Sequence, residues 1–483
     1  MSEELEQRLE AAKKEGKEVV AVLGLGFVGT AVLANLSRTL KEGAPAFFVV
    51  GVDRNDEVGR EKCCKLNEGE PPVYASDPSL RRVISQAHCE HKNIAGTVDP
   101  KIMKYADVVV FCINLDLDRE KGQTERLSMD IGGYEAAMEM VGSVIKPGTL
   151  VTVESTLPVG MCDKVLYPAL CRGQAKQGID TEENPPLLAF CYERVMPGPD
   201  YLDSVNNYWR AFAGINKESA DRAEEFLSRF VNIAEYPLWR HKNTRAAEMA
   251  KLMENSYRAV NIAFIEEWAD LAEATGVDLF DVIASIKVRK GTHDNMMLPG
   301  LGVGGYCLTK DALLAAFGAE EIIGVDAPLP FSRRAILTNE NMPMKAFNWI
   351  NCHFNGSLSG RSAALLGVTY RPGVADTRSS ATEILARALF EGGMAVWAYD
   401  PLISKWDEFD EAELIAGKDW NIQPDAVVIC LPDPAYRDIL AANLSNLRQG
   451  SIVVDPWNMV GDKLAERLSD KGVTVKVYGR GDI

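Results

Sequence analysis

Residues 299–311 read PGLGVGGYCLTKD and bring a thiol, a lysine and an aspartate close together. Glycine permits positive φ and close approach of the backbone to a ligand, so four glycines here indicate more than packing. Cys307 follows the last of them by two residues, where a thiol with ionisable neighbours can act as a nucleophile. The alternative is a surface loop ending at a helix, with Cys307, one of ten cysteines, as a small buried hydrophobe.

A second group of residues fits a dinucleotide. An apolar run over 18–23 is followed by GLGFVG and a helical pattern over 30–40, and a second apolar run over 46–52 leads to Asp53. This order of strand, GxGxxG, helix, strand and aspartate is typical of dinucleotide-binding units. Its first two glycines permit the turn and the approach of the pyrophosphate, and its third permits close packing of helix and strand.

Asp53 favours NAD over NADP, because a carboxylate accepts hydrogen bonds from the ribose hydroxyls and repels a 2′-phosphate. Arg54 weakens this preference without reversing it. Two further apolar runs, 107–113 and 149–153, are followed by Asn114 and by Ser155-Thr156. Ligands bind at the carboxyl ends of parallel strands, so we expect these side chains on the cofactor side, although a helix N-cap would explain Ser155-Thr156 equally well.

The segment from 241 to 276 predicts one very long helix, because apolar residues recur at helical spacing without proline. Lys251 and Asn255 are four residues apart and share one of its faces, where they either belong to a site or to a solvated stripe. Strand and helix alternate again after about residue 360, without GxGxxG. Arg371 and Arg378 there suit a diphosphate.

The composition excludes several classes of function. A net charge of −17 in 483 residues disfavours a nucleic-acid partner, and no apolar run approaches the length of a membrane span. Ten irregularly spaced cysteines indicate reduced thiols and a cytoplasmic location, and the charged residues 1–17 predict a short exposed helix rather than a signal peptide. Cys63, Cys64, Cys89 and two nearby histidines lack zinc-like spacing, so we expect no metal site.

The chain therefore predicts an α/β protein with two Rossmann-like doubly wound domains joined by a helical middle domain. We expect an N-terminal extension at 1–17, an NAD-binding domain at 18–238, a helical middle domain at 239–352 and a Rossmann-like nucleotide-sugar-binding domain at 353–483. A helix as long as that over 241–276 commonly links two domains and supplies a dimer surface.

In this order the segments resemble the UDP-glucose/GDP-mannose dehydrogenase family over residues 19–455. The segments that carry the resemblance are GLGFVG with Asp53, ESTLPVG, ERVMPG, AAEMAKLMENSYRAVNIAF, PGLGVGGYCLTKD and YRPGVADTRSS with AYDP. The ERVMPG segment points to the branch that oxidises UDP-N-acetylhexosamines. The resemblance implies a four-electron oxidation of the C6 alcohol to a carboxylate with NAD, for polysaccharide or glycan precursor synthesis.

The resemblance also assigns residues. It implies Cys307 as nucleophile, Lys251 and Asn255 as oxyanion partners, Glu193 as general base, Asp311 as partner of the lysine and Thr156 as a water-positioning hydroxyl. It implies as cofactor-binding residues Gly24, Gly26, Phe27, Val28, Gly29, Asp53, Arg54, Asn114, Ser155, Thr156, Lys310 and Arg378. It implies as substrate-binding residues Glu193, Arg194, Lys251, Asn255, Arg258, Leu301, Gly302, Gly304, Gly305, Tyr370 and Arg371. It further implies a homodimer through the long helix.

Some positions depart from the family pattern. Residues 113–116 read INLD where the family has V-x-T-P, Tyr306 replaces a histidine, Arg371 a lysine and Glu266 an asparagine. The alternatives are UDP-glucose as substrate, a two-electron β-hydroxyacid dehydrogenase, and a catalytically silent sensor of nucleotide sugars or NAD.

Overall fold

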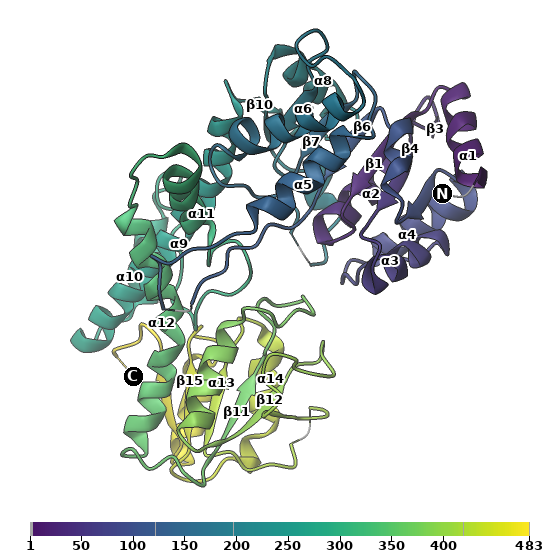
Figure 1. The fold of residues 1–483 in the computed structure, drawn as a ribbon. Coiled ribbons are helices and arrows are strands. Elements are labelled where there is room, and N and C mark those ends of the chain that lie inside the picture. The colour runs from purple at the N-terminus through teal and green to yellow at the C-terminus, as the bar shows by residue number, and fades with distance from the viewer. Residues whose placement is uncertain (1–2, 121, 197, 419, 483) are drawn as a thin grey trace. The chain divides into compact units, whose positions relative to one another are not determined.

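The computed structural model of the chain describes residues 3–120, 122–196, 198–418 and 420–482 (Figure 1). The chain forms two compact units that interleave in sequence. The first contains Met1–Arg119, Leu127–Met253 and Leu314–Pro328, and the second contains Glu120–Arg126, Glu254–Leu313 and Leu329–Ile483. Pro197 of the ERVMPG segment lies outside the described residues.

The first unit is built on an eight-stranded sheet. Its strands are parallel except for the antiparallel pair of β8 and β9. Apart from the exposed edge strand β10, the strands are almost entirely buried, as expected of a parallel sheet covered on both faces. In sheet order they are β10 (Trp239–Arg240), β9 (Ala211–Gly214), β8 (Leu187–Phe190), β7 (Leu150–Val153), β6 (Val108–Phe111), β1 (Glu18–Leu23), β4 (Phe47–Val52) and β5 (Ile94–Thr97).

Helices cover both faces of this sheet (Figure 1). The core on one face includes side chains of α2 (Phe27–Arg38), α3 (Glu57–Asn67), α4 (Pro78–Gln86) and α8 (Lys217–Leu227). The core on the other includes side chains of α1 (Glu3–Lys14), α5 (Ile131–Gly142) and α6 (Tyr167–Lys176). The short elements of this unit are β2 (Leu40–Lys41), β3 (Ala44–Pro45), η1 (Ala87–His91), η2 (Pro100–Tyr105), η3 (Cys162–Leu166), α7 (Asp203–Asn206) and η4 (Gly318–Ile323).

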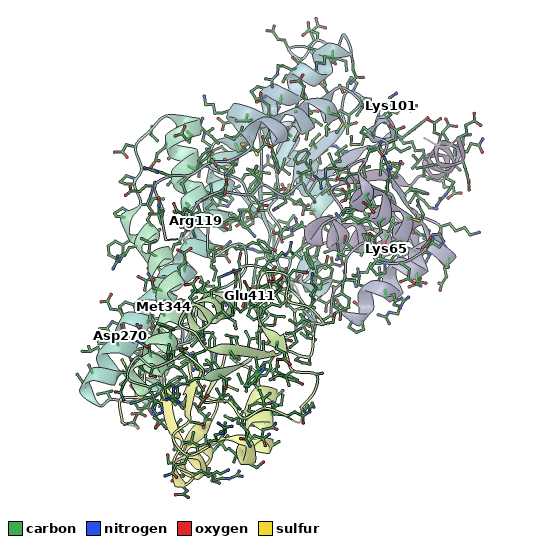
Figure 2. All side chains as sticks on the ribbon, turned by 60° about the horizontal axis from the view of Figure 1, so that its bottom comes forward. Lys65, Lys101, Arg119, Asp270, Met344 and Glu411 are labelled. Carbon is green, nitrogen blue, oxygen red and sulfur yellow. The ribbon has the colours of Figure 1, made fainter. Side chains whose placement is uncertain are left out.

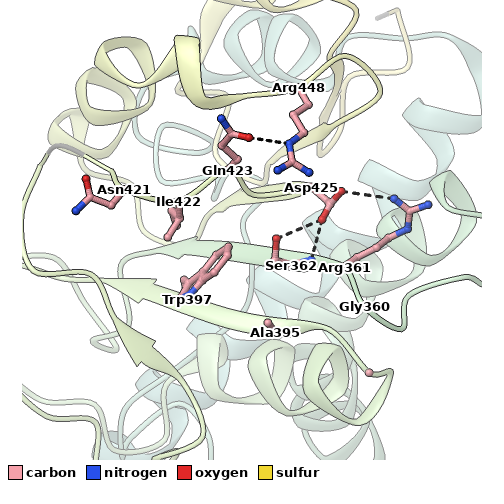
Figure 3. Close-up of a pocket in the computed structure, with 11 residues that line it drawn as sticks. Gly360, Arg361, Ser362, Ala395, Trp397, Asn421, Ile422, Gln423, Asp425 and Arg448 are labelled. Carbon is pink, nitrogen blue, oxygen red and sulfur yellow. Dashed lines mark hydrogen bonds and ion pairs between the residues drawn. The ribbon is translucent and has the colours of Figure 1, made fainter.

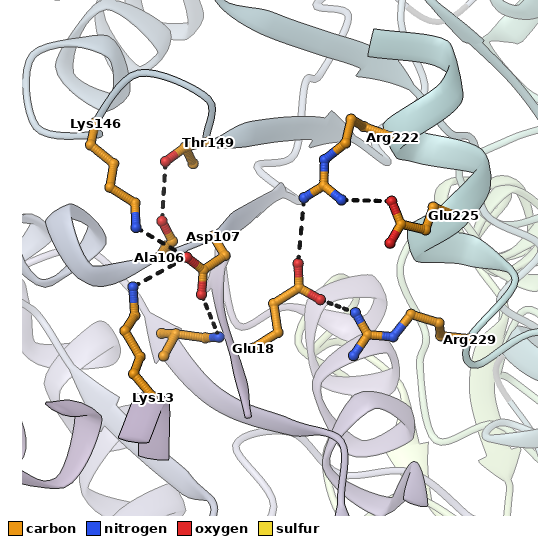
Figure 4. A network of polar contacts seen from close by, with 10 residues as sticks. Lys13, Glu18, Ala106, Asp107, Lys146, Thr149, Arg222, Glu225 and Arg229 are labelled. Carbon is orange, nitrogen blue, oxygen red and sulfur yellow. Dashed lines mark hydrogen bonds and ion pairs between the residues drawn. The ribbon is translucent and has the colours of Figure 1, made fainter. Parts of the chain in front are cut away.

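The N-terminal helix was expected to be exposed, and that expectation is wrong. Leu5 and Leu9 of α1 are buried in the core of the first sheet, because they recur one helical turn apart on one face. Lys13 at the end of α1 lies 3.1 Å from Asp107, which Lys146 also contacts at 3.1 Å (Figure 4). The helix is thus a packed part of the first unit.

The second unit contains a six-stranded parallel sheet with helices on both faces. Its strands in sheet order are β13 (Glu413–Leu414), β12 (Ala395–Tyr399), β11 (Ser362–Leu366), β14 (Ala426–Ile429), β15 (Ile452–Asp455) and β16 (Thr474–Val477). One face packs on α12 (Pro330–His353) and α13 (Ala381–Glu391). The other packs on α14 (Pro434–Ala442) and α15 (Gly461–Asp470), with the short η5 (Leu444–Asn446) between them.

The remaining helices are α9 (Thr244–Thr275), α10 (Leu279–Lys287) and α11 (Asp311–Phe317). In the second unit α9 and α12 lie side by side, near Asp270 and Met344 in Figure 2. Lys345 contacts Glu266 at 2.8 Å, Asp270 at 2.7 Å and Glu273 at 3.2 Å. Glu266, a departure from the family pattern, is therefore a buried partner of Lys345, and burial raises its pKa to about 7.

The predicted fold class, two Rossmann-like domains and a helical middle region, is confirmed. Several element ends differ from the prediction. The helix expected over 30–40 runs from Phe27 to Arg38, so its first turn includes Gly29. The helix expected over 241–276 begins at Thr244 and ends at Thr275.

Candidate active site

The turn after β1 shows three different roles for the glycines of GLGFVG. Gly24 has φ +98, and a Cβ there would lie 2.8 Å from the carbonyl oxygen of Cys112. A Cβ on Gly29 would lie 1.8 Å from the carbonyl oxygen of Gly24. A Cβ on Gly26 would meet no atom within 4 Å, and Gly26 gives α2 no side-chain cap. The open space and uncapped helix N-terminus fit the pyrophosphate of a dinucleotide.

Asp53 lies directly after β4, and its carboxylate is held by neighbouring groups. Its Oδ2 accepts hydrogen bonds from the backbone N–H of Leu25 at 2.9 Å and from Lys62 at 3.2 Å, and its Oδ1 accepts one from Arg54 N–H at 2.8 Å. The Arg54 side chain is largely exposed and contacts Asp56. Lys62 was not predicted, because sequence spacing does not reveal that α3 turns it towards Asp53.

Polar side chains follow β6 and β7, as predicted. Asn114 donates a hydrogen bond to Asp116 at 2.7 Å. Asp116, which departs from the family pattern, therefore holds the Asn114 amide. Ser155 donates to the carbonyl oxygen of Ile113 at 2.5 Å and so ties the two strand ends together. Thr156 is half-buried beside it.

Glu193 and Lys251 form a buried ion pair within the first unit. The Lys251 ammonium donates to the Glu193 carbonyl oxygen at 3.0 Å and to its carboxylate at 3.3 Å. The carboxylate also accepts from the backbone N–H of Val195. Both side chains are buried, and each provides the opposite charge that the other needs in the absence of water. A carboxylate and an ammonium in contact can move a proton and stabilise an oxyanion.

Glu248, one helical turn before Lys251, was not predicted. Its carboxylate accepts hydrogen bonds from the backbone N–H groups of Gly160 at 2.7 Å and Cys162 at 2.8 Å. Burial raises the pKa of this carboxyl to about 7, while the two backbone hydrogen bonds act in the opposite direction. Glu248 thereby connects α9 to the end of the segment that carries Ser155 and Thr156.

Cys307 lies in the second unit, is exposed, and stands just before α11. Its carbonyl oxygen accepts hydrogen bonds from the N–H groups of Lys310 at 3.3 Å and Asp311 at 3.0 Å. Asn255 donates to the buried carboxylate of Asp311 at 2.7 Å. The second unit therefore brings Asn255, Asp311 and the backbone of Cys307 together, whereas Lys251 has its contacts with Glu193 in the first unit.

The glycines before Cys307 pack against their own unit. A Cβ on Gly300 would lie 2.2 Å from the Trp457 ring, and one on Gly302 would lie 2.8 Å from Cβ of Ala381. A Cβ on Gly304 would lie 2.9 Å from Cβ of Tyr370. Close packing thus accounts for glycine at these three positions, a role that the ligand-based interpretation did not anticipate.

Tyr306, a further departure from the family pattern, carries an arginine on its ring. The guanidinium carbon of Arg378 lies 4.9 Å from the ring centre, and Asp376 binds the same guanidinium at 2.9 and 2.7 Å. The backbone N–H of Gly305 also donates to the carbonyl oxygen of Ser379 at 3.2 Å. The loop with the thiol and the loop with the arginine are therefore joined inside the second unit.

The other predicted residues are spread over both units. Burial raises the pKa of Tyr370 to about 12, and this ring packs over Gly305. The guanidinium of Arg194 stacks on the Tyr192 ring at 4.8 Å. Leu301 is in the core of the second unit, so only its backbone is available to a ligand. Phe27 and Val28 are partly buried at the start of α2, Lys310 is half-buried, and Arg258 and Arg371 are exposed.

The second unit also has an open pocket of about 620 Å³ on a different edge of its sheet (Figure 3). Many of the residues that line it precede or begin strands, among them Ser362, Ala395 and Asp425. Asp425 accepts from the backbone and hydroxyl of Ser362 at 3.0 and 3.2 Å. The pocket thus lies at the amino-terminal edge, away from the loops that carry Cys307 and Arg378.

Among the described residues, no set of three or more histidine, cysteine, aspartate or glutamate side chains is arranged to hold a metal ion. None of the described helices combines the length and hydrophobicity needed to cross a bilayer.

Three models of one protein family match successive parts of the chain. The NAD binding domain of the UDP-glucose/GDP-mannose dehydrogenase family matches residues 18–231, its central domain residues 245–341, and its UDP binding domain residues 364–462. The chain therefore belongs to the UDP-glucose/GDP-mannose dehydrogenase family and is an NAD-dependent oxidoreductase that acts on nucleotide sugars. The predictions of family, enzyme class and cofactor are confirmed.

Similar proteins span nearly the same length. A UDP-N-acetyl-D-mannosamine dehydrogenase of Methanococcus maripaludis is 28% identical over 96% of this chain and 97% of its own. The structure of a UDP-D-ManNAc dehydrogenase from Pyrococcus horikoshii matches 96% of this chain and 100% of its own with a TM-score of 0.78 and 27% identity. That of an NDP-N-acetyl-D-galactosaminuronic acid dehydrogenase from Methanosarcina mazei matches 99% and 98% with a TM-score of 0.77 and 25% identity.

Proposed function

We propose that this protein oxidises the C6 alcohol of a UDP-N-acetylhexosamine, foremost UDP-N-acetyl-D-mannosamine, to the carboxylate through a covalent intermediate on Cys307. Two of the three similar proteins described above carry mannosamine in their names. The observation that carries the covalent step is the exposed thiol of Cys307, four residues before Asp311, whose carboxylate accepts a hydrogen bond from Asn255.

The bound cofactor supplies the hydride acceptor, and two NAD⁺ are reduced for each sugar. Loss of a hydride and a proton from C6 gives the aldehyde. The Cys307 thiolate adds to the aldehyde carbon, and the oxygen takes up a proton to give a thiohemiacetal. Loss of a second hydride and the hydroxyl proton gives the thioester. Water then adds, the carbon–sulfur bond breaks, and the thiol and carboxylate are released.

We assign the steps of this reaction to different side chains. We assign to Glu193 the deprotonation of the water that hydrolyses the thioester, since its carboxylate is buried against the Lys251 ammonium. We assign to Lys251 and Asn255 the stabilisation of the oxyanions. Thr156 positions the water, and Asp311 orients Asn255 through the hydrogen bond of 2.7 Å.

The other residues are assigned to the cofactor or to the substrate. The glycines of GLGFVG, Phe27, Val28 and Asp53 hold the dinucleotide, with Asn114, Ser155, Lys310 and Arg378 as further contacts. Arg194, Arg258, Tyr370, Arg371 and the backbone of residues 301–305 hold the nucleotide sugar. The product would serve as a precursor of polysaccharides or glycans in the cytoplasm.

Replacement of the thiol tests the covalent step. Cys307→Ser should lower the rate of uronate formation at least about thousandfold, because a hydroxyl without activation is a far poorer nucleophile. NAD binding should not change. Cys352→Ser is the matched control, since Cys352 is also exposed but lies at the end of α12. Normal uronate formation by the Cys307 variant would rule out the covalent mechanism.

Stoichiometry and substrate choice are measured on the unaltered enzyme. Two NADH per sugar are expected, whereas one NADH would indicate a two-electron β-hydroxyacid type of oxidation. UDP-N-acetyl-D-mannosamine should give a higher kcat/KM than the UDP-linked N-acetylglucosamine, N-acetylgalactosamine and glucose. Preference for UDP-glucose would contradict the assignment to the N-acetyl branch.

We also propose a homodimer through α9. Within the second unit, Tyr257, Phe264, Trp268 and Leu271 of this helix are 46–59% exposed and recur at helical spacing. Large apolar patches on a surface are typical of interfaces. Trp268→Glu should convert the dimer to a monomer in light scattering, whereas Tyr74→Glu, at another exposed aromatic, should not. A monomeric wild-type protein at micromolar concentration would contradict the proposal.

A further inference from the structure

A fully buried ion pair lies behind Glu193 in the first unit. Arg210 is 1% exposed and Glu154 is 0% exposed, and one guanidinium nitrogen of Arg210 donates to the Glu154 carboxylate at 2.6 Å. Glu154 directly follows β7, and Arg210 directly precedes β9. Neither residue touches the groups to which the preceding section assigns bond-making steps.

The same nitrogen of Arg210 also donates to the carbonyl oxygen of Cys191 at 2.9 Å. Cys191 directly follows β8 and stands two residues before Glu193, whereas Glu154 stands two residues before Thr156. One buried nitrogen therefore ties together the ends of the two strands from which the proposed base and the proposed water-positioning hydroxyl extend.

Stability alone does not explain the ion pair of Arg210 and Glu154. Within the described part of the chain, Oε1 of Glu154 and both Nε and Nη1 of Arg210 have no hydrogen-bond partner, although all three atoms are buried. A buried ion pair with unsatisfied polar atoms is generally less favourable than apolar side chains of similar size. Its presence at this place therefore calls for a role other than packing.

The charges of the pair also act on Glu193. Burial raises the pKa of Glu154, Arg210 opposes that change, and Glu193 adds to it. Burial alone would lower the pKa of Arg210, and the nearby Glu154, Cys191 and Glu193 raise it. The charged or titratable groups that face Glu193 from the surrounding elements are Lys251 of α9, Glu154 after β7, Arg210 before β9, Cys112 after β6 and Tyr201 before α7.

We propose that Arg210 and Glu154 are positioning residues for the hydrolysis of the covalent intermediate, because they hold the Glu193 and Thr156 strand ends in register and supply the buried charge beside Glu193. This inference rests on the proposed roles of Cys307 and Glu193. It assigns the pair to the last chemical step, in which water must be held and deprotonated, rather than to the first loss of hydride.

The test separates hydrolysis from the earlier steps. In Arg210→Met, the first NADH should form at the wild-type rate, whereas uronate release should slow at least about tenfold and an acylated Cys307 peptide should accumulate in mass spectra of the quenched enzyme. Arg210→Lys keeps the charge and should restore part of the hydrolysis rate. Arg172→Met is a matched control, because Arg172 forms ion pairs on the surface of α6.

Removal of one partner leaves an unpaired buried charge that can prevent folding, so the double variant Glu154→Gln/Arg210→Met supports the test. It should fold, bind NAD and still accumulate the acylated peptide. Glu154→Gln alone removes the carboxylate that holds Arg210, so it should also slow hydrolysis and accumulate the acylated peptide.

The outcomes distinguish this inference from the proposed function. Wild-type hydrolysis by the double variant, or by Glu154→Gln, would overturn the role of the pair while the covalent mechanism stands. If the wild-type enzyme and Cys307→Ser both form uronate without an acylated cysteine, the covalent mechanism itself fails. A general slowing of both NADH-forming steps would show that the pair serves folding only.

Discussion

In each of the two large sheets, the strand that comes first in the chain is followed by the same kind of turn. Gly24 after β1 has φ +98 and donates to the carbonyl oxygen of Val52 at 2.8 Å, and Gly367 after β11 has φ +95 and donates to that of Tyr399 at 2.8 Å. In each case an aspartate after the neighbouring strand accepts from the turn backbone. Asp53 does so at 2.9 Å, and Asp400 does so at 3.0 and 3.2 Å.

The two turns diverge within three residues. In the first unit α2 starts at Phe27, directly after the uncapped Gly26. In the second, residues 368–380 intervene before α13, and the Ser380 hydroxyl caps that helix by accepting from Thr382 N–H at 3.2 Å. An uncapped N-terminus leaves donors for a phosphate, whereas a capped one has used a donor.

The comparison shows that the same scaffold is followed by different polar groups in the two units. The first turn offers backbone N–H groups and a helix end, and the inserted segment of the second offers the exposed guanidinium of Arg371. Arginine binds a diphosphate through charged side-chain donors instead. The strand–turn–aspartate frame is therefore common to both units, and they differ in the residues after the turn.

The largest effect is expected from crowding the first turn. Gly29→Ala would place a Cβ 1.8 Å from a backbone oxygen, so it should lower the free energy of unfolding by about 3 kcal/mol and abolish NAD binding. Thermal unfolding and NAD titration measure both. Gly132→Ala in α5 has ordinary space around its Cβ and serves as the control. Wild-type stability of the Gly29 variant would contradict this description of the turn.

Removal of Asp400, which holds the turn after β11, should destabilise the second unit. Asp400→Ala leaves the N–H groups of Val368 and Thr369 without their acceptor and should cost about 2 kcal/mol of stability. Titrations should show weaker UDP binding and unchanged NAD binding. Loss of NAD affinity in this variant would mean that the two turns do not act separately.

Gly26→Ala tests the open space at the uncapped helix. The added methyl group meets no protein atom within 4 Å, so unfolding should not change. It would stand where the pyrophosphate approaches, and NAD affinity should fall about tenfold, or about 1.4 kcal/mol. Isothermal titration gives the affinity. Unchanged NAD binding would place the pyrophosphate elsewhere.

The smallest effect is expected at Glu248 and Ser380, whose side chains both accept hydrogen bonds from backbone N–H groups. Glu248 holds backbone N–H groups with a carboxyl whose pKa is raised to about 7, whereas Ser380 uses a hydroxyl that does not titrate. Because the folded pKa exceeds the unfolded value, stability from protonated Glu248 is lost as the pH rises through 7.

From pH 6 to pH 8 the wild-type free energy of unfolding should therefore fall by about 1 kcal/mol relative to Glu248→Gln. Ser380→Ala should cost about 1 kcal/mol at both pH values. Denaturant unfolding at the two pH values measures these changes. A pH dependence that persists unchanged in Glu248→Gln would show that another group titrates.

Local signals made much of the fold predictable. The apolar runs before Gly24 and Asp53 identified buried strands, and the absence of proline over 241–276 identified α9, since both patterns depend only on neighbouring residues. The chemistry at Glu193 and Lys251 was suggested by motif, and their contact was not visible in spacing because 58 residues separate them.

The residues that sequence reasoning missed depend on long-range contacts. Arg210 meets Glu154 across 56 residues, and nothing near Arg210 marks it as buried. Tyr306 and Glu266 stood out as departures from the family pattern. Their explanation required Arg378 and Lys345, which reach them only in the folded second unit.

The interleaving of the two units limits how the protein can be divided. A fragment that ends at Met253 would lack Leu314, which packs with Val159 and Leu252 in the core of the first unit. It would also retain residues 120–126, whose Thr124 carbonyl oxygen accepts from Arg333 of the second unit. Fragment complementation, in which both halves are produced together, is therefore a more suitable way to separate the two nucleotide sites than truncation.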